Sequence, residues 1–124
     1  MIRGIGVDTV DIERFSRQLA SAPALRARLF APVERELAVP SLAARFAAKE
    51  ALVKALRGSW NLGWQDLVVE RDEDRAPGFA ATPGLAGCLL ELGIARPHLS
   101  MTHDGGFATA FVVVEGRAGG EGDA

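Results

Sequence analysis

The sequence predicts a single α+β domain in which a small, mainly antiparallel sheet packs against a long central helix and shorter helices. Two observations predict this class. Segments typical of strands lie near both ends of the chain, with alternating patterns at residues 2–8 and 98–103 and a strongly apolar run at residues 107–115. Between them lie segments with helical spacing of apolar residues, and the longest, from a predicted N-cap at Ser41 to Arg57, contains no glycine or proline.

The composition is that of an ordinary globular protein, since 48% of the 124 residues are hydrophobic and 24% are charged. A net charge of −2 argues against nucleic acid as a partner. We find no signal peptide and no apolar run long enough to span a membrane, and the single Cys88 excludes an internal disulfide. We therefore expect a cytoplasmic location without membrane association. Residues 1–115 should form the domain, and the glycine-rich residues 116–124 should be disordered.

The first element is a strand from Ile2 to Asp8, and its alternation places Gly4, Gly6 and Asp8 on one face. Two glycines beside an acid leave that face without bulk, so another backbone or a ligand can approach it closely. Alternatively, Asp8 only ends the strand and caps the helix that follows.

A helix is expected next, over residues 11–19, and Arg14 and Arg17 share one side of it. Such an arginine face is commonly just solvated, and the alternative is a docking surface for an acidic partner. A second short helix should follow in residues 23–30, and a single helical turn in residues 33–39, between Pro32 and Pro40.

The central helix carries the residues from which a function can be inferred. Glu50 lies on the same side as Phe46 and Val53, at the edge of the stripe that should face the core. A buried carboxylate needs a partner, which could be Lys54 one turn later or a metal ion. Lys49 and Lys54 are the only lysines of the chain. The simpler alternative is an exposed helical face with one i,i+4 ion pair.

The remaining elements alternate between strands and a helix. We expect a strand over Trp64–Arg71, an exposed charged turn over residues 71–75 and a short returning strand over residues 77–81. A helix should follow from Pro83 and end at Gly93, with Cys88 as a small core residue.

The last two strands, His98–His103 and residues 107–115, flank a glycine-rich turn. His103 stands at a strand end beside this turn, so it is the better placed of the two histidines to meet a ligand. A histidine that is hydrogen-bonded within the structure is the ordinary alternative.

Taken together, Asp8, Glu50, Lys54 and His103 form an unusual set. Two carboxylates suit Mg²⁺, and a lysine and a histidine beside such an ion would supply positive charge to phosphate oxygens. A Walker-type glycine-rich loop does not occur in the sequence, so this would not be a P-loop enzyme. A Mg²⁺-dependent phosphoesterase of another kind and a non-catalytic partner-binding module are the alternatives.

Three motifs follow one another across nearly the whole chain, over about residues 2–115. They are Gly4-Ile5-Gly6-Val7-Asp8 followed by Asp11-Ile12-Glu13-Arg14; Arg45-Phe46-Ala47-Ala48-Lys49-Glu50-Ala51 with Lys54-Ala55-Leu56; and His98-Leu99-Ser100-Met101-Thr102-His103-Asp104. In this order they resemble the motifs of the holo-acyl-carrier-protein synthases, the small 4′-phosphopantetheinyl transferases.

The resemblance implies the 4′-phosphopantetheinyl transferase fold and a Mg²⁺-dependent reaction that serves lipid biosynthesis. In this reaction the 4′-phosphopantetheine group of coenzyme A is transferred to a serine of apo acyl carrier protein, and adenosine 3′,5′-bisphosphate is released. The resemblance also implies a homotrimer with active sites between neighbouring subunits.

By position in the motifs, Asp8 and Glu50 match the magnesium ligands of the family. Lys54 matches the lysine near the transferred phosphate, and His103 matches the histidine that contacts coenzyme A. The resemblance therefore implies a catalytic set of Glu50, Lys54 and His103.

Three further residues match positions that meet the substrates. Arg14 matches an arginine that meets the acidic helix of the carrier protein, and Arg45 and Lys49 match positions near coenzyme A. The chain departs from the family pattern at Arg57, where glycine is usual, and over residues 59–63, so contacts to the phosphates of coenzyme A should differ there.

Overall fold

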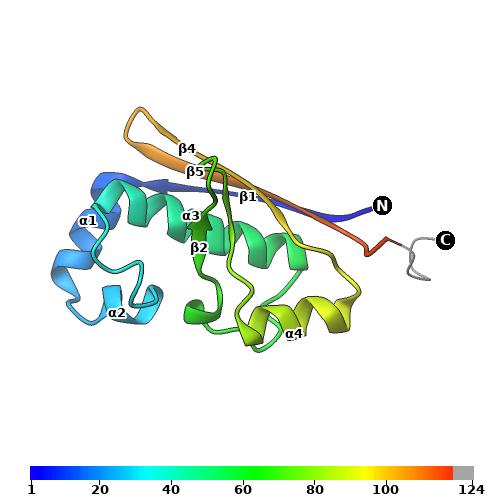
Figure 1. The fold of residues 1–124 in the computed structure, drawn as a ribbon. Coiled ribbons are helices and arrows are strands. Elements are labelled where there is room, and N and C mark those ends of the chain that lie inside the picture. The colour runs from blue at the N-terminus through cyan, green and yellow to red at the C-terminus, as the bar shows by residue number, and fades with distance from the viewer. Residues whose placement is uncertain (119–124) are drawn as a thin grey trace.

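In the computed structural model, which describes residues 1–118, a three-stranded sheet covers one side of a long helix, and smaller elements lie on its other side (Figure 1). The helices α1 and α2 lie near the N-terminal end of the long helix, and α4 lies near its C-terminal half. This arrangement confirms the predicted α+β class. The elements in chain order are β1 (Ile2–Asp11), α1 (Ile12–Ser21), α2 (Leu25–Leu29), α3 (Val39–Leu56), the 3₁₀ helix η1 (Trp64–Asp66), β2 (Val69–Arg71), β3 (Pro77–Phe79), α4 (Pro83–Leu92), β4 (His98–Asp104) and β5 (Phe107–Glu115).

The main sheet is antiparallel with the strand order β1-β5-β4, so β5 is central and β1 and β4 form the two edges. Asp8 of β1 pairs with Ala110, and His103 of β4 pairs with Ala108. Because both alanines are buried, these registers turn Asp8 and His103 to the face of the sheet that covers α3. The short strands β2 and β3 form a separate antiparallel pair.

The strand β1 lies unusually close to α3, as its two glycines predict. A Cβ atom added at Gly4 would lie 2.0 Å from the carbonyl oxygen of Ala55, and one added at Gly6 would lie 2.0 Å from that of Ala51. The two glycines therefore allow the backbone of α3, rather than a ligand, to approach this face of β1 closely. It places Asp8, two residues further along the same face, beside the part of α3 that carries Glu50.

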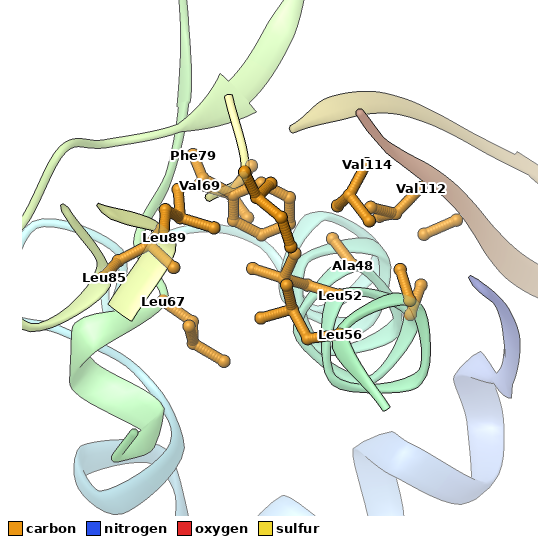
Figure 2. Close-up of a cluster of buried hydrophobic side chains, with 14 of the residues drawn as sticks. Ala48, Leu52, Leu56, Leu67, Val69, Phe79, Leu85, Leu89, Val112 and Val114 are labelled. Carbon is orange, nitrogen blue, oxygen red and sulfur yellow. The ribbon is translucent and has the colours of Figure 1, made fainter. Parts of the chain in front are cut away.

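Two groups of buried side chains form the core. The first contains Leu52 of α3, Leu89 of α4 and Val112 of β5 (Figure 2). The second group joins α1, α2 and the first half of α3, around Phe15 and Phe30. The helix α3 belongs to both groups, so it is the element against which the rest of the chain is packed.

The helix α3 begins earlier than predicted. Its first residue is Val39 and its N-cap is Ala38, which makes no side-chain capping bond, so the predicted N-cap at Ser41 is wrong. Pro40 lies in the first turn, where its missing N–H would have no helical partner in any case.

The segment from residue 64 also differs from the prediction, because Trp64–Asp66 forms a 3₁₀ helix and only Val69–Arg71 is a strand. The ring of Trp64 packs against that of Phe46, with 5.4 Å between centroids, so a tertiary contact outweighs the strand propensity of tryptophan.

The ends of two other elements lie later in the chain than predicted. The strand β1 continues to Asp11, whose carboxylate caps α1 by accepting the N–H of Arg14 at 3.0 Å, so Asp8 is not the cap. Gly116 forms a β-bridge with Ile94, and ordered structure therefore continues past residue 115. Residues 119–124 of the predicted tail lie outside the described residues. None of the helices in the described part of the chain is both long and apolar enough to span a membrane.

Candidate active site

One cluster of charged side chains lies between the edge strand β1 and α3. Lys54 Nζ donates to Asp8 Oδ1 at 3.1 Å and to the carbonyl oxygen of Val7 at 3.1 Å. Burial raises the pKa of the Glu50 carboxyl, and the negative charge of Asp8 raises it further, while Lys54 lowers it. The structure therefore brings Asp8, Glu50 and Lys54 together as predicted, although Lys54 is bonded to Asp8 rather than to Glu50.

The donor set of this cluster fits a magnesium ion. Two carboxylates lie near one ammonium, and after burial the negative charge of Asp8 is the next cause of the raised pKa of Glu50, so the two carboxylates are close enough to repel each other. Within residues 1–118, no group of three or more histidine, cysteine, aspartate or glutamate side chains is gathered for a metal. An ion bound here would take Asp8 and Glu50 and complete its shell with water and substrate oxygens, the arrangement that Mg²⁺ commonly adopts.

A second cluster, of basic side chains, surrounds a small cavity of about 80 Å³ on another part of α3. Arg45, Arg71 and His103 line it, together with the hydroxyl-bearing Ser41 and Thr102. Arg45 Nε is buried without a hydrogen-bond partner. Burial lowers the pKa of Arg45, the charge of Glu34 raises it, and the charge of Arg71 lowers it. A phosphate-type anion would neutralise the neighbouring cations and accept a hydrogen bond from the unpaired buried donor.

The sequence did not single out Arg71, because it lies where a charged surface turn begins. Strand alternation could have found it, since it places Arg71 on the same face as Val69, which is buried.

The two clusters are separate within one chain. Asp8, Glu50 and Lys54 do not line the cavity that holds His103. Arg45 and Glu50 are five residues apart on α3, which turns them about 140° from each other, and Asp8 and His103 belong to opposite edge strands. The set of four residues predicted from the sequence is therefore divided, with His103 apart from the other three.

Lys49 does not fit the predicted contact with coenzyme A. Its side chain is fully buried, and Nζ donates to Glu34 Oε1 at 2.7 Å and to the carbonyl oxygens of Leu29 and Trp64. All three ammonium protons are used within the chain, so none is left for a substrate.

Arg14, the predicted carrier contact, is exposed on α1. Its guanidinium forms no ion pair within residues 1–118, whereas Arg17 pairs with Glu13 at 2.9 Å. The helix α1 also forms one wall of a groove of about 390 Å³. Apolar and aromatic side chains from α1, α2, α3 and η1 line much of this groove, among them Phe15, Leu25, Leu29, Phe46 and Trp64.

Comparison with known proteins identifies the class. Residues 4–112 match the model of the 4′-phosphopantetheinyl transferase superfamily. The chain belongs to this superfamily, which confirms the recognition made from its motifs, and it is accordingly a transferase.

Relatives within the superfamily point to one group of enzymes. The chain is 57% identical to the holo-[acyl-carrier-protein] synthase of Clavibacter michiganensis subsp. michiganensis, over 95% of this chain and 99% of the relative. It superposes on the crystal structure of the holo-[acyl-carrier-protein] synthase from Neisseria meningitidis with a TM-score of 0.86 and 35% identity, covering 93% of this chain and 99% of that one. The Helicobacter pylori synthase, solved in complex with coenzyme A, superposes with a TM-score of 0.78 and 30% identity over 90% of this chain and 99% of that one.

Proposed function

We propose that this chain transfers the 4′-phosphopantetheine group of coenzyme A to a serine of apo acyl carrier protein and releases adenosine 3′,5′-bisphosphate. The observation that carries the proposal is the convergence of Asp8 from β1 with Glu50 and Lys54 from α3. The named activity of the similar synthases supports the same reaction.

The acidic cluster is the proposed site of the phosphoryl chemistry. Asp8 and Glu50 would hold Mg²⁺, which when bound supplies positive charge to the pyrophosphate oxygens of coenzyme A. The serine hydroxyl loses its proton to solvent and its oxygen forms a new bond to the β-phosphorus, while the bond from that phosphorus to the bridging oxygen breaks and leaves its electrons on the departing bisphosphate. Lys54 is 54% exposed at its side chain, so its ammonium can turn from Asp8 towards the negative charge that develops on the leaving bisphosphate.

The basic cavity is the proposed site for the remaining phosphate of coenzyme A. That molecule carries a 3′-phosphate apart from its pyrophosphate, and a cavity of about 80 Å³ suits one group of this size. Arg45 and Arg71 would donate to the phosphate oxygens, and His103 would donate as well when protonated. His103 thus binds substrate in this proposal rather than taking part in the bond-breaking step.

Homotrimer formation would join the two clusters. The outer face of the sheet carries Ile5, Val7 and Phe111, which are 61%, 52% and 45% exposed. Neighbouring copies that covered this apolar face would bury it, and the β1 edge of one copy could then meet the β4 edge of the next. Coenzyme A would span both clusters across the interface.

The proposed carrier surface is α1 with the adjoining groove. Arg14 on α1 and Arg28 in the groove offer positive charge, and the aromatic lining offers an apolar contact. An acidic helix with an apolar stripe complements this surface. We also propose a cytoplasmic location, which the free thiol of Cys88 supports.

The test is a transfer assay read by mass spectrometry. The chain is incubated with coenzyme A, MgCl₂ and an apo acyl carrier protein, and the carrier is weighed. We expect the carrier to gain one phosphopantetheine group, with an equal amount of adenosine 3′,5′-bisphosphate, and we expect EDTA to prevent both.

Controls distinguish the other classes. A carrier whose acceptor serine is replaced by alanine should not be modified. Release of the bisphosphate without any carrier would indicate a phosphoesterase, and binding of the carrier without either product would indicate a partner-binding module.

A further inference from the structure

A buried ion pair lies inside the domain, and neither of its side chains lines the basic cavity or the groove beside α1. The side chains of Lys49 on α3 and Glu34 in the preceding turn are 0% and 1% exposed, with 2.7 Å between Nζ and Oε1. The other two ammonium protons go to the carbonyl oxygens of Leu29, at 2.9 Å, and Trp64, at 3.2 Å. The ammonium also lies 5.0 Å from the centre of the Phe30 ring.

Glu34 connects the pair to two further segments. Its Oε1 also accepts the N–H of Ala31 at 3.1 Å, and its Oε2 accepts the N–H of Val69 at 3.2 Å. Apolar residues of similar volume are often as stabilising as a buried ion pair, and burial lowers the pKa of Lys49 despite the opposing effect of Glu34. The pair is therefore better explained by the geometry that it imposes than by a gain in stability.

That geometry is the shape of the groove beside α1. Leu29 of α2 and Trp64 of η1 both line the groove, and Lys49 donates to the backbone carbonyl of each. Phe46 also lines the groove, and its ring lies 5.4 Å from those of both Phe15 and Trp64. Without the ammonium, both carbonyls would lose a buried partner, and the exposed hydrogen bond from Gln65 to the carbonyl oxygen of Ala27 would have to hold η1 against α2.

We propose that Lys49 and Glu34 are positioning residues for the carrier protein, which hold the groove walls at the spacing that admits the apolar side of an acidic helix. The inference rests on the proposed transfer reaction and on docking of the carrier at α1. Neither residue lines the basic cavity proposed for coenzyme A, and both act through backbone groups beside the groove.

Steady-state kinetics of Lys49→Met separate this role from a general loss of stability, because KM does not depend on the fraction of enzyme that is folded. We expect KM for the apo carrier protein to rise about tenfold, while KM for coenzyme A stays within about twofold of the wild type. Glu34→Gln keeps the shape of the side chain but turns an amide group towards a backbone N–H, so carrier KM should rise about threefold.

The matched control is Leu89→Ala, which removes a buried side chain of α4 that does not line the groove. It should lower stability and leave both KM values unchanged. If Lys49→Met lowers kcat alone, or raises KM for coenzyme A, the proposal is overturned.

A second measurement is independent of catalysis. The chain has two tryptophans, so in a Trp60→Phe background only Trp64 fluoresces. Under conditions where circular dichroism shows each variant to be folded, Lys49→Met should increase acrylamide quenching of Trp64, and Leu89→Ala should not. Unchanged quenching would overturn the proposal. A wild-type chain that transfers nothing would refute the proposed function, while the quenching result would still decide whether Lys49 shapes the groove.

Discussion

The substitution Gly6→Ala tests whether the close packing of β1 on α3 places the acidic cluster. The new Cβ would lie 2.0 Å from the carbonyl oxygen of Ala51 and 2.9 Å from the backbone nitrogen of Ala55. Both neighbours are backbone atoms of a helix, so no side-chain rotation can relieve the clash. The strand and the helix must therefore separate by roughly 1 Å, which also moves Asp8 away from Glu50.

Two effects follow from that separation. Overpacking of this kind costs about 1–3 kcal/mol, and we expect the upper part of this range because the backbone must move. Misplacing reacting groups by about 1 Å can lower a rate by about 100-fold. Urea unfolding followed by tryptophan fluorescence measures the first effect, and the transfer rate of enzyme shown to be folded measures the second.

The matched control is Gly87→Ala in the interior of α4, where an added Cβ would meet nothing within 4 Å. It should raise the free energy of unfolding by about 0.5–1 kcal/mol and leave the transfer rate unchanged. A Gly6→Ala enzyme with the unfolding midpoint and rate of the wild type would refute the reasoning.

Three further predictions concern single charges. Without Mg²⁺, Glu50→Gln should raise the free energy of unfolding near neutral pH, because burial holds the folded-state pKa of Glu50 above its unfolded value. The wild-type protein therefore loses stability as pH rises through the folded-state pKa of Glu50, and the advantage of glutamine should vanish below about pH 4, where Glu50 is protonated in both the folded and the unfolded protein. Urea titrations at several pH values measure this difference. The same variant should lose magnesium-dependent transfer. Arg14→Glu should raise KM for the carrier protein about tenfold without changing KM for coenzyme A, and an unaltered carrier KM would argue against docking on α1. Arg71→Met should raise KM for coenzyme A about tenfold but hardly affect dephospho-coenzyme A, which lacks the 3′-phosphate; equal effects on both would place Arg71 outside that subsite.

Local patterns were sufficient for the acidic cluster. Glycines alternating with Asp8 predicted a bare strand face, and helical spacing placed Glu50 at the edge of the core. Both rules depend on the periods of a strand and a helix, and the two segments adopt the strand and the helix that the rules assume. The approach of β1 to α3 then brought the two acids together.

Tertiary context decided the features that the sequence did not reveal. Lys49 and Glu34 are 15 residues apart in the sequence, and they pair only because the chain folds back between them. A pattern of neighbouring residues does not tell which acidic side chain will partner a buried lysine. The prediction that Lys49 contacts coenzyme A came from its motif position alone, which carries no information about burial. Trp64 was expected in a strand, but its contact with Phe46 favours a 3₁₀ turn.

The central claim, that Asp8 and Glu50 hold one metal ion jointly, is tested most directly by calorimetric titration of Mg²⁺ into the enzyme with coenzyme A present. The wild type, Asp8→Asn, Glu50→Gln and the double variant form a thermodynamic cycle. We predict one ion per site in the wild type, a loss of about tenfold or more in affinity for each single variant, and a double variant that is little worse than either one. Affinities unchanged in both single variants, or losses that simply add in the double variant, would contradict the shared site.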